Sequence, residues 1–202
     1  KIRYGMVGGG PGAFIGGVHR RAAQLDGQFA LVCGAFSSDP KKSAAMAAEL
    51  GLDEGRCYGS YAEMIHGEKT LSRNARMEAV SVVTPNHVHF DPCRRALEAG
   101  FPVICDKPMT FTVDEAKKLA ALVKKTGLPF GLTHNYTGYP LVKQARHLVK
   151  SGALGTIRKV VVNYPQGWLS EKIEDSDQKQ AAWRTDPKRS GISCCIGDIG
   201  TH

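Results

Sequence analysis

Two side chains near the end of the sequence have the types and the spacing for proton transfer. Asp198 and His202 lie four residues apart in the segment GDIGTH. On a helix this spacing puts both on one face, where the acid can orient the imidazole or bind a hydroxyl group. The unperturbed pKa of histidine, about 6.5, suits it to take a proton near neutral pH. Taken alone, the pair is also typical of an exposed helical pair or a cap.

A glycine-rich turn near the start of the sequence has the pattern of a phosphate-binding loop. It contains G-x-G-x-x-A at Gly8, Gly10 and Ala13, closes an apolar strand-like segment and opens a helical one. Glycines let the backbone approach a pyrophosphate, whose charge then lies at a helix N-terminus, and this context separates the motif from an ordinary turn. We predict dinucleotide contacts from Gly8, Gly10, Pro11, Gly12, Ala13, Phe14 and Ile15.

The residues after the second strand-like segment bear on the choice between NAD and NADP. NAD-binding domains of this kind normally have an acid there for the ribose hydroxyls. Ser37 occupies that position and Ser38 follows, with Lys42 nearby, whereas Asp39 can be a helix cap alone. Serine and lysine can accommodate a 2′-phosphate. The sequence leans slightly to NADP and leaves NAD open.

Strand-length apolar segments alternate with helical patterns over the first two thirds of the chain. We expect strands at 2–8, 30–36, 79–84, 102–105 and 129–134, with a helix after each of the first four and a further helix opened by Ser60. Continuous apolar strands separated by helices are typical of a parallel sheet covered on both faces. Residues 1–134 are therefore predicted to form an α/β domain, a Rossmann-type doubly wound sheet.

Residues 135–202 are predicted to begin a second, α+β substrate domain. We expect a helix at about 141–151 and, at 156–164, a strand of an incomplete open sheet. Residues 165–190 are polar and irregular, as in a long functional loop. A lone strand of such a sheet leaves an open edge and an apolar face. We therefore expect these 202 residues to be a fragment that binds dinucleotide but turns over poorly in isolation.

Composition argues against several other classes of protein. The chain of 202 residues is 42% hydrophobic and 23% charged, as expected for a globular protein with a real core. Its net charge of +8 comes from scattered lysines and arginines, which argues against a nucleic-acid partner. No segment approaches the length of a membrane span. The 6 cysteines are irregularly spaced without C-x-x-C, which favours reduced thiols in a cytoplasmic protein over a metal site or a zinc dehydrogenase.

Two further segments, VVTPNHVHF and VICDKPMT, put polar residues at the carboxyl ends of predicted parallel strands, where open α/β sheets bind ligands. Together with the glycine turn, AAWRTDP and GDIGTH, in this order along all 202 residues, they resemble the Gfo/Idh/MocA oxidoreductase family. Two departures are that Asp106 stands where the family usually has glutamate, and that SGISCCIGD keeps only Gly191 of the family's small residues.

The resemblance implies an enzyme that moves a hydride between NAD or NADP and a hydroxyl-bearing carbon of a sugar, sugar derivative or cyclitol. It implies that Lys107 lies beside the nicotinamide and the reacting hydroxyl, that His202 is the general base, and that Asp198 orients substrate or base. Further cofactor contacts are expected at Thr84, Pro85, Asn86, His89, Asp106, Asn135, Trp183 and Arg184. Tyr136 and Trp168 are expected at the substrate, although either can instead be structural.

One alternative stays open beside the enzyme. Some proteins of this fold are non-catalytic sensors that bind a dinucleotide and a partner protein. The presence of both Lys107 and His202 favours the enzyme. The resemblance also implies a homo-oligomer, a dimer or tetramer, for the full-length protein.

Overall fold

The computed structural model describes residues 1–176, 181, 184–191 and 195–202. The chain divides into two compact units, Lys1–Thr133 and His134–His202. Trp183, predicted to contact the cofactor, lies outside the described residues.

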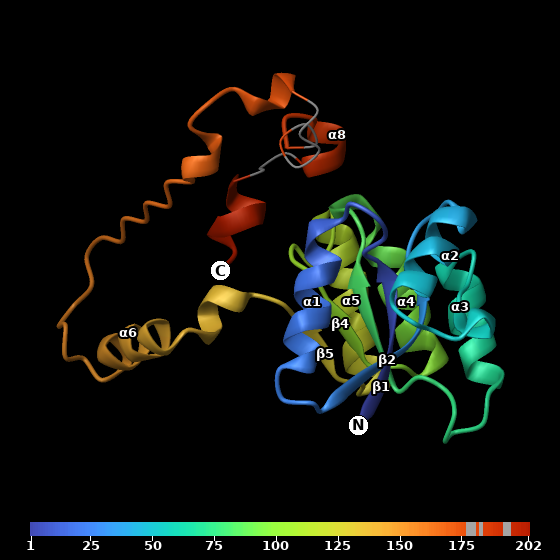
Figure 1. The fold of residues 1–202 in the computed structure, drawn as a ribbon. Helices are drawn as coiled ribbons and strands as arrows, with labels where there is room; N and C mark the ends of the chain where they lie inside the picture. The colour runs from blue at the N-terminus through green and yellow to red at the C-terminus, as the bar shows by residue number, and fades with distance from the viewer. Residues whose placement is uncertain (177–180, 182–183, 192–194) are drawn as a thin grey trace. The chain divides into compact units, whose positions relative to one another are not determined.

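The first unit is built on a five-stranded parallel sheet with the order β2-β1-β3-β4-β5 (Figure 1). Its strands are β1 (Ile2–Gly8), β2 (Phe29–Ala35), β3 (Ala79–Val83), β4 (Val103–Cys105) and β5 (Phe130–Leu132). The chain passes from one half of the sheet to the other between β2 and β3, so β1 and β3 flank the switch point. In open α/β sheets, ligands bind beyond the carboxyl ends of the strands at such a point.

Five α-helices accompany the sheet. They are α1 (Phe14–Gln24), α2 (Pro40–Glu49), α3 (Tyr61–Thr70), α4 (Phe90–Ala99) and α5 (Val113–Thr126). Local side chains begin several of them: Ser60 accepts a hydrogen bond from the Glu63 amide, and Thr112 forms a reciprocal capping box with Glu115. Such caps satisfy amide groups that have no partner inside the helix.

Two apolar clusters show that the helices cover both faces of the sheet. Neighbouring residues of β1 divide between the clusters: Met6 lies with the cluster that α1 and α2 join, and Val7 lies with the one that α3, α4 and α5 join. Adjacent strand residues point to opposite faces. The predicted α/β doubly wound sheet, with a core on each face, is therefore confirmed.

The second unit contains η3 (Asn135–Gly138), α6 (Pro140–Lys150), η4 (Gly167–Leu169), η5 (Ile173–Asp175), α8 (Pro187–Ser190) and a π-helical turn (Ile196–Gly200). The strand predicted at 156–164 is wrong: this stretch has no regular secondary structure, and Val160 and Val162 are 77% and 78% exposed. A strand exists only with a hydrogen-bonding neighbour, and the described part of this unit contains none.

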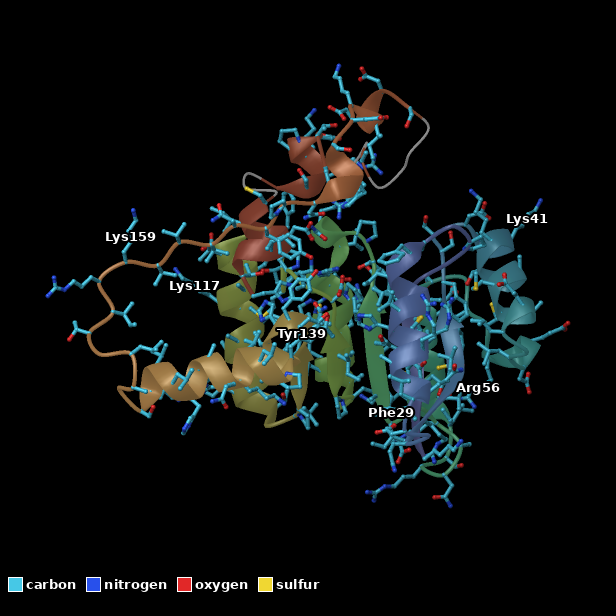
Figure 2. The ribbon with its side chains drawn as sticks, turned by 60° about the vertical axis from the view of Figure 1, so that its left-hand side comes forward. Phe29, Lys41, Arg56, Lys117, Tyr139 and Lys159 are labelled. Atoms are coloured by element: carbon cyan, nitrogen blue, oxygen red, sulfur yellow. The ribbon has the colours of Figure 1, made fainter. Side chains whose placement is uncertain are left out.

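Lysines are spread over both units. Lys41 lies on α2, Lys117 on α5 and Lys159 in the irregular stretch, and all three are exposed (Figure 2). Among the described residues, no helix is long and apolar enough to cross a membrane, and no group of three or more His, Cys, Asp or Glu side chains is placed to hold a metal ion.

Candidate functional site

Backbone atoms leave no room for a side chain at Gly10, in the glycine turn between β1 and α1, or at Gly16, in the first turns of α1. A Cβ on Gly10 would lie 2.6 Å from the carbonyl oxygen of Phe36, and one on Gly16 would lie 2.5 Å from the Cα of Gly9. The turn therefore passes directly over the end of β2, and α1 packs against the turn, as a dinucleotide-binding loop requires. The close approach of α1 to the turn is made at Gly16, and Ala13 is the N-cap of α1.

The remaining residues predicted from this turn divide between surface and core. Pro11, Gly12 and Ala13 are exposed, and so is Phe14 at the start of α1. Ile15 packs against the apolar cluster on the α1 side of the sheet. The Ile15 side chain therefore contributes to the core next to the turn.

Replacing Gly10 with alanine is expected to weaken dinucleotide binding about tenfold, since the new methyl group forces the turn away from the end of β2. The measurement is a fluorescence titration of the full-length protein with NAD and NADP. Gly17→Ala is the matched control, because a Cβ there would have no neighbour nearer than 3.9 Å. Equal affinities for the two variants would contradict this role of the turn.

The segment after β2 presents no free acid at the ribose position. Asp39 caps α2 by accepting a hydrogen bond of 2.9 Å from the Lys41 amide, and the Ser37 hydroxyl accepts one of 3.1 Å from the Asp39 amide. Ser38 and Lys42 are exposed. The Asp39 carboxylate is therefore engaged in the helix cap.

The carboxyl end of β3 carries polar groups that face the switch point. The Oγ1 of Thr84 is buried and has no hydrogen-bond partner among the described residues. Pro85 and Asn86 follow, and Asn86 begins the short helix η2 (Asn86–Val88). A buried hydroxyl without a partner is uncommon in a folded protein and is typical of a ligand-binding position.

His89 does not line the groove as predicted. Its side chain has no exposed surface. Its Nδ1 lies 2.7 Å from the carbonyl oxygen of Pro108, and its Nε2 lies 2.9 Å from that of Thr84. With both nitrogens occupied by backbone carbonyls, His89 can act on a ligand only through the two segments that it joins.

Asp106, directly after β4, is held by two side chains from other parts of the first unit. The Thr133 hydroxyl donates to Asp106 Oδ1 at 2.8 Å, and His19 Nε2 lies 3.4 Å from the same oxygen. His19 Nδ1 lies 3.1 Å from the hydroxyl of the buried Ser81. Burial alone would raise the pKa of Asp106, but the hydrogen bonds from His19 and Thr133 hold it below its ordinary value. The next residue, Lys107, is thereby anchored at the backbone.

Sequence reasoning missed His19 and Ser81. A serine inside the apolar strand AVSVV and a histidine three residues after Gly16 on α1 were the available signals. Each is a polar residue on a face that the helical or strand period places inside. Lys107 itself lies at the predicted position, at the carboxyl end of the sheet, and its peptide bond to Pro108 is cis.

In the second unit, His202 lies among aromatic rings. Its ring centroid is 4.6 Å from that of Tyr136 and 5.1 Å from that of His134. The hydroxyl groups of Tyr136 and Tyr164 are 2.6 Å apart, and this hydrogen bond raises the pKa of Tyr136 to about 12. Tyr136 therefore remains a neutral hydroxyl at physiological pH, beside the imidazole.

Asp198 belongs to a second set of contacts in the same unit. Its Oδ2 lies 3.4 Å from Nη2 of Arg184, whose guanidinium carbon lies 5.1 Å from the centroid of the Trp168 ring. Asp198 also adds its negative charge to the surroundings of Tyr136. The helix predicted for Asp198 and His202 is a single π-helical turn that ends before His202. Asn135 is an exposed residue at the start of η3.

A parallel sheet with a glycine turn at its switch point, and polar groups along its carboxyl edge, defines an α/β dinucleotide-binding domain. Residues 2–146 match the model of an oxidoreductase family with an NAD-binding Rossmann fold, and residues 142–202 match the model of the GFO/IDH/MocA C-terminal domain. The chain belongs to the Gfo/Idh/MocA oxidoreductase family, as the sequence motifs predicted.

Three similar proteins illustrate the family. The uncharacterized oxidoreductase YfiI of Bacillus subtilis is 37% identical over 202 residues, which are 100% of this chain and 51% of the relative. Levoglucosan dehydrogenase of Pseudarthrobacter phenanthrenivorans is 28% identical, covering 100% of this chain and 49% of the relative. The structure of an inositol dehydrogenase homolog from Azotobacter vinelandii, complexed with NAD+, has a TM-score of 0.91 and 41% identity, covering 100% of this chain and 51% of that one. The chain thus spans about half the length of these relatives.

Proposed function

We propose that the protein containing this chain is an NAD(P)-dependent oxidoreductase acting on a secondary alcohol or carbonyl of a sugar, sugar derivative or cyclitol. The observation that carries the proposal is the turn at Gly10, which closes so tightly on the end of β2 that only a backbone fits there. Bare amides at a helix N-terminus suit a pyrophosphate. The names of the relatives, a levoglucosan dehydrogenase and an inositol dehydrogenase homolog, support the substrate class.

The chain's own residues then bind the cofactor and move a proton. The nicotinamide, when bound, accepts or returns the hydride. The glycine turn holds the pyrophosphate, and Thr84 offers its hydroxyl to the ligand side of the sheet. Lys107 and His202 take and return the proton of the reacting hydroxyl, because hydride loss from an alcohol needs a base for that proton. Asp198, paired with Arg184, orients the substrate or the base.

The cofactor preference follows from the residues after β2. Ser37 in place of an acid, with Lys42 exposed nearby, supports NADP, whereas the NAD+ complex of the Azotobacter vinelandii homolog supports NAD. Both dinucleotides therefore belong in the test. We also expect the full-length protein to be a homo-oligomer.

A screen of sugars and cyclitols with NAD and with NADP tests the proposal on the full-length protein. Nicotinamide absorbance is the readout, and dinucleotide affinity is measured in parallel. We expect reduction of at least one dinucleotide with a polyol or sugar substrate. Tight dinucleotide binding without turnover of any compound would favour the non-catalytic sensor, and absence of dinucleotide binding would overturn the proposal altogether.

A further inference from the structure

The buried histidine His89 has two hydrogen-bond partners that can only accept. Its Nδ1 lies 2.7 Å from the carbonyl oxygen of Pro108 and its Nε2 lies 2.9 Å from that of Thr84. A carbonyl oxygen has no proton to give, so each ring nitrogen must carry a hydrogen for both bonds to form. Only the imidazolium has two N–H groups. The two contacts therefore fit a charged ring, at a position with no exposed surface.

The two carbonyls belong to the two segments that form the ligand side of the sheet. Thr84 directly follows β3, and Pro108 lies in the segment after β4. His89 precedes α4, so a single side chain joins three parts of the first unit. Because Lys107 is the residue before Pro108, the bond to the Pro108 carbonyl holds the backbone that carries the Lys107 ammonium.

We propose that His89, as an imidazolium, is a positioning residue that clamps the segments after β3 and β4 in their dinucleotide-binding arrangement, and that its deprotonation loosens this clamp. A neutral ring keeps one N–H, so one of the two carbonyls loses its donor inside the protein. An unpaired buried carbonyl costs free energy, which favours movement of that segment. The effect on dinucleotide binding rests on the proposed function, whereas the charge on the ring does not.

The groups around His89 set the direction of the pH dependence. Burial alone would lower the pKa of the imidazole, but the neighbouring Cys105 side chain and the hydrogen bonds to the two carbonyls hold it above its ordinary value. Cys105 of β4 is a neutral thiol, because its hydrogen bond with Cys93 of α4 and its burial raise its pKa well above the usual value. The carboxylate that responds to the charge of His89 is Asp106. The clamp is complete below the ordinary histidine pKa of 6.5 and is lost as the pH rises through the folded-state pKa of His89.

Nitrogen NMR of the imidazole rings tests the charge directly. In 15N-labelled full-length protein, we expect both ring nitrogens of His89 to give the signature of protonated nitrogens at about pH 6. His89→Gln removes these signals and so assigns them, and the exposed His87 serves as a comparison in the same spectra. A His89 ring with one unprotonated nitrogen at that pH would overturn the imidazolium.

The pH dependence of dinucleotide affinity tests the clamp. Between about pH 6 and about pH 9, we expect the Kd of the wild-type protein to rise roughly tenfold. The His89→Gln variant should bind weakly with little dependence on pH, and His87→Gln should follow the wild type. A purely structural role would lower the stability of His89→Gln and leave the pH profile of affinity unchanged, which would contradict the clamp.

The two measurements separate failure of the clamp from failure of the proposed function. If the protein binds dinucleotide and a ring nitrogen of His89 is unprotonated, the clamp is wrong and the proposed function stands. If the ring is charged and neither NAD nor NADP binds, the proposed function fails, and the role of His89 in dinucleotide binding fails with it. Should His89→Gln not fold, single variants of the six other histidines assign the His89 signals by elimination, and the wild-type spectra and wild-type pH profile still decide between these outcomes.

Discussion

Replacing Lys107 or His202 with alanine in the full-length protein is expected to lower kcat about 10²- to 10⁴-fold while the dinucleotide still binds. This range is the usual contribution of a positioned proton donor or acceptor to rate. Initial rates, followed by nicotinamide absorbance, give kcat, and a fluorescence titration gives the Kd for dinucleotide. Lys117→Ala and His147→Ala are matched controls, since both residues are exposed on helices, α5 and α6. Near-normal rates in both test variants would mean that the assigned roles are wrong.

The division between kcat and Kd separates proton transfer from a collapsed site. Lys107 follows an anchored residue, because Asp106 is held by His19 and Thr133. Loss of the Lys107 ammonium should therefore leave the segment after β4 in place. His202 lies against the ring of Tyr136 in the second unit, and the first unit carries the glycine turn. Replacing His202 should therefore leave the dinucleotide affinity within about threefold of the wild type, a difference below about 1 kcal/mol.

The first unit could be predicted from the sequence because its signals are local. Each strand is a short apolar run, and caps such as Ser60 and Thr112 lie directly before their helices. Periodicity and capping need only neighbouring residues. The structure reproduces the five strands with bounds that differ by two residues at most from those predicted.

The parts that could not be predicted depend on contacts between distant residues. His19 and Asp106 are separated by 87 positions, and nothing near either residue in sequence indicates the other. The same holds for His89, whose T-P-N-x-x-H context suggests a groove residue, although its ring turns inward to Pro108. A sequence pattern can place a side chain on an element, but the partners that decide its role lie on other elements.

The stretch 156–164 shows a different limit. Its partly alternating pattern is typical of a strand with one solvated face, but alternation describes only side chains. A strand also needs hydrogen bonds to the backbone of a neighbouring strand, and the described residues of the second unit contain no strand that could pair with this stretch. The π-helical turn at Ile196–Gly200 could not be predicted either, because the spacing of two residues does not distinguish an α-helical turn from a wider one.

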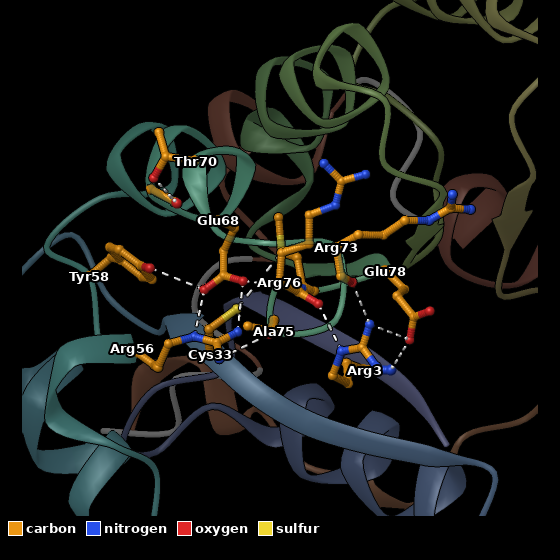
Figure 3. A network of polar contacts seen from close by, with 12 residues as sticks. Arg3, Cys33, Arg56, Tyr58, Glu68, Thr70, Arg73, Ala75, Arg76 and Glu78 are labelled. Carbon is orange, nitrogen blue, oxygen red and sulfur yellow. Dashed lines mark hydrogen bonds and ion pairs between the residues drawn. The ribbon is translucent and has the colours of Figure 1, made fainter.

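Replacing Glu68 with glutamine is expected to lower the free energy of unfolding by about 3–5 kcal/mol, the usual cost of breaking a buried ion pair by removing one partner. The Glu68 carboxylate on α3 is fully buried. It accepts two hydrogen bonds of 2.7 Å from Arg56, one of 3.0 Å from the Tyr58 hydroxyl and one of 2.7 Å from the Met77 amide (Figure 3). Urea denaturation of the full-length protein measures the loss.

Four donors from three residues converge on this one carboxylate, so its charge organises the side of the sheet where β2 and α3 pack. The negative charge of Glu68 also acts on two neighbouring groups. Burial and Glu68 together raise the pKa of Tyr58 to about 12, and the same two causes raise the pKa of the Cys33 thiol. In the glutamine variant, the amide nitrogen faces donors that need an acceptor, and the Arg56 guanidinium keeps its charge without a counter-charge. Both effects destabilise the folded state and leave the unfolded state unchanged.

The partly exposed pair of Arg3 and Glu78 provides the matched control for Glu68. Its charged atoms lie 3.3 Å apart, and the Glu78 side chain is 45% exposed. Glu78→Gln should therefore cost less than about 1 kcal/mol. Combining Glu68→Leu with Arg56→Met should recover much of the stability, since the pair leaves no unpaired charge behind when both members are removed. A double variant as unstable as Glu68→Gln would instead locate the loss in the Tyr58 and Met77 hydrogen bonds, which need the carboxylate but not the arginine.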